Sequence, residues 1–360
     1  MEMAGWSCAG HAEIEPHARA VLRHHWPTVP LHGDVSKLHG SIFAGITMLT
    51  GGSPCQDLSI AGKRAGMTEG SGTRSSLFYE QVRIWQESEA PYILWENVLG
   101  ALSSNTGRDF AAVLSALVGA TVPVPDDGWG GAGVASGPTG VAAWRVLDAQ
   151  YFGVPQRRRR VFVLGARAGG FDPAEVLALS ESMQGDSGAG GGTKENSATG
   201  TGSPAAECGV STYSIDTRNA SRTTAKDEQN RQGLGIGERN GVAPTLTGLF
   251  VPAVATVYEW HGLDGRARSV ERASTLSTEC RIGREGHLVA SPTRGPRLFT
   301  PREQERLMGW EDDRTAEGLD EAEQSYRLTD AQRAKLCGNG IASPVAAWIG
   351  MRLRDALITP

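Results

Sequence analysis

The sequence predicts an α/β fold, because short apolar runs alternate with amphipathic helical patterns through the first half of the chain. Six runs are expected strands, at residues 8–14, 30–35, 46–52, 92–98, 141–149 and 160–166. Between them, residues 16–26, 76–86 and 107–120 repeat apolar side chains at helical spacing. Such alternation is typical of a parallel sheet with crossover helices, and here it ends near residue 168.

The length of 360 residues favours about two domains. Residues 1–168 form the expected α/β domain, 169–209 a glycine- and serine-rich linker, and 210–296 a smaller, mainly β domain. In the last of these, APTLT at 243–247 is echoed by ASTLS at 273–277, which indicates a β-hairpin unit used twice or simply a packing repeat.

Residues 297–360 are expected to return to the first domain as helices. Two helix starts are marked by capping residues, at Thr300–Glu303 and Thr329–Gln332. The acidic stretch between them, residues 312–325, is expected to be a surface loop, and residues 343–353 read as a further helix after a turn at 338–340.

Composition excludes several classes of protein. No apolar run is long enough to span a membrane, and residues 1–13 lack a basic and then apolar leader, so a cytoplasmic protein is expected. The five cysteines are scattered, which argues against a disulfide framework or a zinc site. A net charge of −5 argues against nucleic acid as a partner, yet residues 266–306 carry nine arginines against five glutamates and are a candidate phosphate-facing segment.

Chemically active residues follow the predicted strands where each strand ends. Glu13 and Asp34 end the first two, Cys55 follows the third, and Glu96 and Asn97 end the fourth. Each carboxylate alone is more often a solvated loop residue. Because ligands of such sheets bind beyond the carboxyl ends of the strands, their repeated placement predicts one shared crevice.

Four consecutive arginines, Arg157 to Arg160, stand at the start of the last predicted strand. Strand alternation sends Arg158 and Arg160 to one face and Arg157 and Arg159 to the other. A cysteine needs a raised thiolate fraction to attack carbon, and nearby guanidinium groups favour the thiolate. We therefore expect Arg158 and Arg160 to point inward, toward Cys55.

The order of five motifs resembles the DNA cytosine-5 methyltransferase family. These are SPCQ at 53–56, WENV at 95–98, QRRRR at 156–160, TPREQERLMGW at 300–310 and CGNGI at 337–341. The resemblance covers roughly residues 8–168 and 297–355. It implies a Rossmann-like methyltransferase sheet, a smaller target-recognition domain at 210–296, and a bacterial or phage enzyme that acts as a monomer on double-stranded DNA.

The resemblance also implies catalytic roles. Cys55 resembles the family's nucleophile, which adds to C6 of a cytosine swung out of the duplex, and Glu96 the residue that holds or protonates N3. Arg160 resembles the arginine that binds the base at O2, and Arg158 the one that braces the surrounding loops. Pro54, Gln56 and Asn97 are supporting residues of the same motifs.

S-adenosyl-L-methionine is the cofactor that the resemblance implies. Glu13 matches the family residue that binds the ribose hydroxyls, and Asp34 the residue near the adenine. Leu77 matches an apolar adenine contact, and Asn339 the asparagine of the last motif. No metal is expected.

The sequence departs from the family pattern at its beginning. The family opens with a strand and a glycine-rich F-x-G-x-G-G turn, whereas this sequence starts inside the helix that follows. Either Met1 is an internal methionine of a longer frame, or this is a degenerate copy. We expect the missing strand to leave unpaired the strands that hold Glu13 and Cys55. Gly340 is a second departure, since the family usually has serine or alanine there.

Three functions therefore remain open. The first is an active DNA cytosine-5 methyltransferase. The second is a remnant that binds DNA without methylating it, because the glycine-rich turn is absent. The third is an unrelated thiol enzyme using Cys55, which lacks a histidine in a recognisable partner motif.

Overall fold

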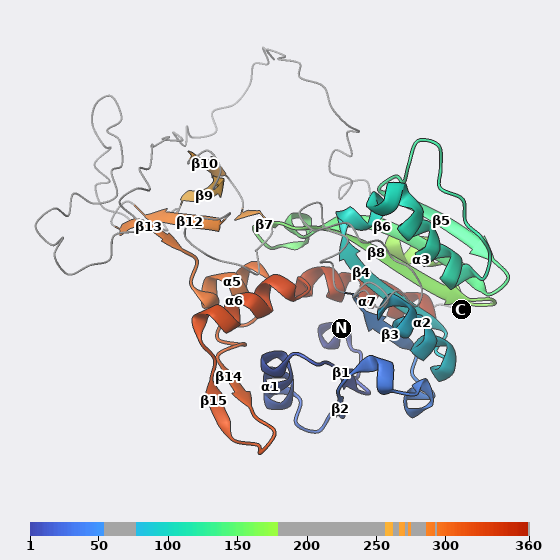
Figure 1. Ribbon diagram of the computed structural model, residues 1–360, viewed down its shortest axis with the longest axis horizontal. Helices are drawn as coiled ribbons and strands as arrows, with labels where there is room; N and C mark the ends of the chain where they lie inside the picture. Colours follow the sequence, from blue (N-terminus) through green and yellow to red (C-terminus); the bar gives the residue numbers. More distant parts are fainter. Residues whose placement is uncertain are drawn as a thin grey trace, which may run out of the picture. The chain divides into compact units, whose positions relative to one another are not determined.

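The computed structural model of the chain (Figure 1) describes residues 1–53, 77–178, 256–261, 266–270, 273–274, 286–291 and 294–358. Between 256 and 296 the description covers the backbone only. Pro54, Cys55 and Gln56 lie outside the described residues, as do the first repeat at 243–247 and most of the expected linker.

The chain divides into two compact units. The first comprises Met1–Met183, Ser274–Thr278 and Thr300–Pro360, and the second comprises Gln184–Ala273 and Glu279–Phe299. The first and last parts of the chain therefore belong to the same unit. The last helices thus lie in the unit that contains the first strands.

A five-stranded sheet forms the centre of the first unit. Its strand order is β3 (Met48–Gly51), β4 (Tyr92–Val98), β8 (Arg159–Arg167), β6 (Gly140–Asp148) and β5 (Ala132–Gly137). Only β3 and β4 run parallel, and the other neighbours are antiparallel. The expected parallel pairing is therefore observed for β3 and β4 and is wrong for β8, β6 and β5. The cause is connectivity, since β5 to β6 is a tight hairpin and no helix of crossover length lies between β6 and β8.

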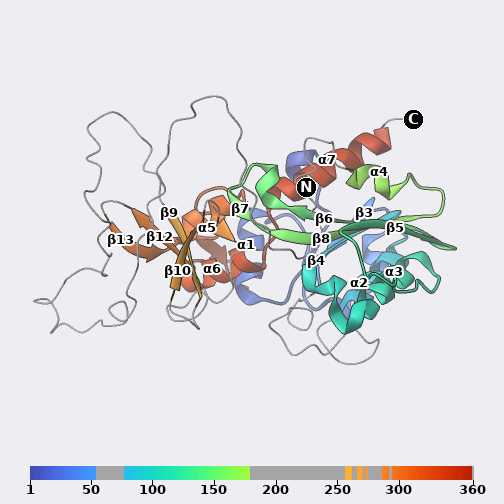
Figure 2. The same cartoon turned by 90° about the horizontal axis from the view of Figure 1, so that it is seen from above.

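Helices cover both faces of this sheet (Figure 2). On one face lie α2 (Leu77–Ser88) and α3 (Arg108–Val118), and on the other lie α4 (Pro173–Leu177) and α7 (Ser343–Ile358). The first face buries large aromatic side chains: Phe78, Trp85, Trp95, Phe110 and Trp144. The α4 helix falls in the stretch that we expected to be linker, and its Val176 and Leu177 are buried.

A separate parallel pair, β1 (His11–Ala12) and β2 (Leu31–His32), flanks the helix α1 (Pro16–His25). Within the described ranges no strand joins this pair to β3. No residue of β3 is buried, whereas five of the seven residues of β4 are. Strands of parallel sheets are ordinarily covered on both faces. Among the described strands, β3 is therefore paired on one side only, by β4.

The C-terminal part adds α5 (Pro301–Leu307), the hairpin β14 (Glu317–Leu319) and β15 (Ser325–Arg327), and α6 (Asp330–Asn339). Both predicted capping boxes are formed, by Thr300 with Glu303 and by Thr329 with Gln332. Two local expectations are wrong. The acidic stretch contains a β-hairpin that packs against α1, and residues 338–339 extend α6 rather than forming a turn.

Short elements connect these strands and helices. They are η1 (Glu2–Ala4), η2 (Val35–Lys37), η3 (Gly40–Phe43), η5 (Leu99–Leu102), η6 (Ser104–Gly107), η7 (Ala149–Phe152), β7 (Gln156–Arg157) and β11 (Ala273–Ser274).

The second unit contains a four-stranded antiparallel sheet. Its order is β10 (Arg266–Val270), β9 (Thr256–His261), β12 (Gly286–Ser291) and β13 (Arg294–Leu298). The described secondary structure of this unit is thus all β, while the bounds of the smaller domain stay a prediction.

Candidate active site

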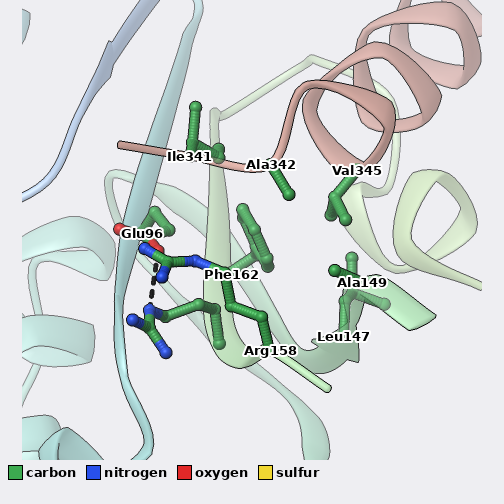
Figure 3. Close-up of a pocket in the computed structure, with 9 residues that line it drawn as sticks. Glu96, Leu147, Ala149, Arg158, Phe162, Ile341, Ala342 and Val345 are labelled. Atoms are coloured by element: carbon green, nitrogen blue, oxygen red, sulfur yellow. Dashed lines mark ion pairs between the residues drawn. The ribbon is translucent and has the colours of Figure 1, made fainter. Parts of the chain in front are cut away.

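Glu96 lies near the end of β4 and forms an ion pair with Arg160 of the neighbouring strand β8. Arg160 Nε is 3.2 Å from Glu96 Oε1, and 23% of the Glu96 side chain is exposed (Figure 3). Burial raises the pKa of Glu96, although the Arg160 and Arg158 guanidinium groups oppose the shift. The carboxyl therefore keeps a proton to higher pH than an ordinary glutamate, which suits a hydrogen-bond or proton donor.

Arg158 connects the start of β8 to the end of α6. Its side chain is 3% exposed, and Nη2 donates to the backbone carbonyls of Gly338 at 3.1 Å and Gly340 at 2.6 Å. Arg157 and Arg159 are exposed, so the alternation predicted for the arginine run is observed. The inward arginines thus have different partners, a carboxylate for Arg160 and the α6–α7 connection for Arg158.

A small cavity lies beside Glu96 (Figure 3). Charged groups stand at one end and apolar side chains at the other. The lining residues are Glu96, Leu147, Ala149, Arg158, Arg160, Phe162, Ile341, Ala342 and Val345. The cavity therefore brings apolar surface together with a carboxyl and two guanidinium groups.

The chain that leads to Cys55 is held against the end of β4. Asn97 Nδ2 donates to Ser53 Oγ at 3.1 Å and to the Ser53 carbonyl at 3.3 Å, and Trp95 Nε1 donates to Ser53 Oγ at 3.3 Å. A Cβ on Gly52 would lie 2.9 Å from the Glu96 carbonyl, so only glycine fits without displacement. Sequence reasoning assigned no role to Ser53, Gly52 or Trp95, although Ser53 and Trp95 lie inside the quoted motifs and Gly52 precedes the first of them.

Glu13 and Asp34 follow the adjacent parallel strands β1 and β2 at the same edge. Glu13 Oε1 accepts from the backbone N–H groups of Ile14 and Glu15, at 2.7 and 2.8 Å. Asp34 Oδ1 accepts from the N–H and hydroxyl of Ser36, and the pKa of Asp34 is lowered by these bonds. Both carboxylates are thus oriented acceptors, which fits the hydroxyl and amine donors of a nucleoside.

The remaining predicted cofactor residues lie on helices. Leu77 begins α2 and is half-buried, and Asn339 is the exposed last residue of α6. The α6 helix contacts α1 through Lys335 Nζ and Glu15 Oε1, 3.2 Å apart. No hydrogen bond between described residues joins Leu77 or Asn339 to the two carboxylates.

Two arginines of the expected phosphate-facing segment already have carboxylate partners. Arg302 pairs with Asp313, and Arg306 Nη2 lies 2.6 Å from Asp312. These two side chains are therefore poor candidates for binding phosphate. In the part of the chain that the structure describes, no group of three or more acidic, histidine or cysteine side chains is arranged to hold a metal ion. None of its helices combines the length and apolar character needed to cross a bilayer.

Two curated methyltransferases are similar to this chain in sequence. A DNA N-6-adenine-methyltransferase of Escherichia phage P1 is 29% identical over 448 residues, covering 99% of this chain and 59% of that protein. The type II methyltransferase M.NgoBV of Neisseria gonorrhoeae is 31% identical over 166 residues, covering 44% of this chain and 34% of that protein. This chain thus spans less than two thirds of either relative.

Two crystal structures resemble the chain in fold. The Dnmt2 methyltransferase of S. pombe has a TM-score of 0.53 at 16% identity, covering 99% of this chain and 94% of that one. A putative DNA modification methyltransferase encoded within an E. coli prophage has a TM-score of 0.52 at 17% identity, with the same coverage. The family model described as C-5 cytosine-specific DNA methylase matches residues 1–355. The chain therefore belongs to the C-5 cytosine-specific DNA methylase family.

Proposed function

We propose that this chain methylates C5 of cytosine in double-stranded DNA, with S-adenosylmethionine as methyl donor and Cys55 as a transient covalent nucleophile. One observation carries most of the weight. The Glu96 carboxyl has a raised pKa and pairs with Arg160, and the chain that enters the Cys55 segment lies directly against it. An acid and a cation thus lie together at the strand end from which the chain continues toward Cys55.

The ring chemistry explains why these groups belong together. C5 of cytosine is a poor nucleophile until a group adds across the 5,6 bond, and the base must leave the stack to be reached. The Cys55 thiolate forms a bond to C6, while Glu96 gives its proton to N3 and so neutralises the charge pushed into the ring. C5 would take the methyl group as S-adenosylhomocysteine leaves. Water would then accept the C5 proton, the thiolate would depart to restore the 5,6 double bond, and N3 would return its proton to the Glu96 carboxylate.

The two inward arginines would act differently. Arg160, beside Glu96, offers guanidinium donors suited to the O2 oxygen of the base. Arg158 is held by the carbonyls at the end of α6, so it would position the α6–α7 connection rather than the base. Asn97 would support the chain before Cys55, with Pro54 and Gln56 as its neighbours.

S-adenosylmethionine would supply an electrophilic methyl group. The residues present fit its nucleoside part, because Glu13 and Asp34 are acceptors held at neighbouring strand ends. Leu77 would contact the adenine, and Asn339 would lie near the bound cofactor. The two carboxylates would fix the orientation of the nucleoside.

A second candidate is a DNA-binding protein that does not methylate. The observation in its favour is that no strand among the described residues joins β1, which leads to Glu13, with β3. The phage P1 relative raises the further question of the methylated atom, because its name specifies N6 of adenine. An exocyclic amine is already a nucleophile and needs no thiol addition.

Nucleoside analysis separates these functions. The chain is incubated with duplex DNA and S-adenosylmethionine carrying a labelled methyl group, and the DNA is digested and resolved by mass spectrometry. We expect labelled 5-methyl-2′-deoxycytidine, lost in Cys55→Ser but kept in the control Cys208→Ser. Labelled N6-methyladenine would refute the proposal, and DNA binding without any labelled nucleoside would favour the second candidate.

A further inference from the structure

Ser53 is the residue on which two buried side chains of β4 converge. Trp95 is fully buried and Asn97 is 2% exposed, and each donates to the Ser53 hydroxyl oxygen. Asn97 also donates to the Ser53 carbonyl. Three hydrogen bonds thus fix one residue at the point where the chain leaves β3.

The orientation of Asn97 is set independently of Ser53. Its Oδ1 accepts from the backbone N–H of Val98 at 2.8 Å, so Nδ2 must face Ser53. Trp95 and Asn97 lie on the same face of β4, opposite Glu96, because side chains alternate along a strand. Trp95 and Asn97 therefore hold Ser53 from the face that α2 and α3 cover, while Gly52 lets the backbone pass against Glu96.

Only Pro54 separates Ser53 from Cys55 in the sequence. Cys55 follows Ser53 by two residues, a reach of at most about 7 Å. The intervening Pro54 has a ring-fixed φ and restricts the residue before it to extended conformations. Few backbone rotations therefore separate a fixed Ser53 from Cys55.

We propose that Ser53 is a positioning residue, whose hydroxyl, held by Trp95 and Asn97, sets how far the Cys55 thiol stands from Glu96. The inference rests on the proposed function, in which Cys55 attacks the base. Ser53 touches no reacting atom and acts only through the chain that it anchors. Its loss should therefore loosen the thiol and slow covalent addition while leaving DNA affinity unchanged.

A nitroxide spin label on Cys55 tests the anchoring without requiring methyl transfer. The full chain carries Cys8→Ser, Cys208→Ser, Cys280→Ser and Cys337→Ala, so that Cys55 alone is labelled. We expect Ser53→Ala to give a more mobile spectrum, and Ser53→Thr, which keeps the hydroxyl, to resemble the parent. Asn97→Ala should loosen the label similarly, and combining it with Ser53→Ala should add little.

Covalent addition to 5-fluorocytosine DNA provides the second readout, in unlabelled protein. Ser53→Ala is expected to slow the adduct about 10- to 100-fold, the scale of a misplaced reacting group, with an unchanged Kd for DNA. The matched control is Ser88→Ala, since Ser88 is also a buried, hydrogen-bonded serine but lies at the far end of α2.

The two readouts distinguish the possible failures. An unchanged label spectrum in Ser53→Ala, or equal loosening in Ser88→Ala, overturns the role of Ser53. If the parent forms no adduct with the DNA, the proposed function fails, yet label mobility still decides whether Ser53 anchors the Cys55 segment.

Discussion

Arg333 of α6 forms a buried ion pair with Glu305 of α5, its Nη2 lying 3.0 Å from Glu305 Oε1. Glu305 has no exposed surface, and its carboxylate also accepts from the backbone N–H groups of Asp313 and Thr315 and from the Thr315 hydroxyl. One carboxylate therefore ties α5, α6 and the segment before β14 together. The α6 helix that it holds ends at the carbonyls that bind Arg158.

Replacing Glu305 tests whether this pair is structural. Glu305→Ala should lower the free energy of unfolding by about 1–3 kcal/mol, because the N–H groups of Asp313 and Thr315 lose their acceptor and Arg333 keeps only Asp313 as a carboxylate partner. The control is Glu321→Ala, whose pair with Arg23 is solvent-exposed and should cost under about 1 kcal/mol. Urea titration measures both, and equal losses would contradict a specific role for the buried pair.

Arg158 offers a second stability test. Arg158→Met should cost about 2–4 kcal/mol, since two backbone carbonyls at the end of α6 lose their charged donor. Arg159→Met, on the exposed side of the same run, should change stability by no more than about 0.5 kcal/mol. If the two variants unfold at the same urea concentration, the bridge contributes nothing to stability.

The departure at Gly340 has a steric explanation. A Cβ on Gly340 would lie 2.4 Å from Cζ2 of Trp310, and the indole Nε1 is held by the carbonyl of Ile341. Gly340→Ala should therefore destabilise the protein by about 1–3 kcal/mol, as overpacking does. Trp310→Phe should partly relieve that loss in the double variant. In the control Gly130→Ala, the nearest atom is 3.7 Å away and stability should hold. If Gly340→Ala leaves the free energy of unfolding unchanged, the Trp310 indole can move aside at no cost, and the steric explanation is wrong.

The raised pKa of Glu96 predicts a pH dependence with a defined sign. A carboxyl with a folded-state pKa above its unfolded value stabilises the fold only while it stays protonated, and this contribution is lost as pH rises through the folded pKa. Glu96→Gln has no such loss. Its stability relative to wild type should therefore increase as pH rises above the ordinary glutamate range and then level off. Denaturation series at successive pH values measure the difference, and a constant difference would contradict the shift.

Local signals in the sequence predicted local structure well. The arginine run alternates as expected, and both threonine caps form, because each depends on residues within a few positions. Glu96 and Asn97 lie near the end of β4 on opposite faces, and the crevice shared with Glu13, Asp34 and Cys55 stays a prediction.

The relative direction of the strands and the contacts between residues far apart in the sequence could not be predicted from the sequence. The β5 strand, AGVASG, consists of small residues and glycine without a strand signature, and it is stabilised by pairing with β6. The hairpin in the acidic stretch was not predicted, because it depends on packing of Gly318 against Ala20, some 300 residues away in sequence. Ser53 and Asn97 are 44 positions apart, and nothing in either motif identifies the other as its partner.

The most direct test of the central claim is covalent trapping on a duplex that contains 5-fluorocytosine, with S-adenosylmethionine present. Fluorine at C5 cannot leave as a proton does, so the thiolate should remain bonded to C6. The account predicts a stable protein–DNA adduct, located by peptide mass spectrometry at Cys55 and absent in Cys55→Ser. An adduct that persists in Cys55→Ser, or that maps to another residue, would contradict it.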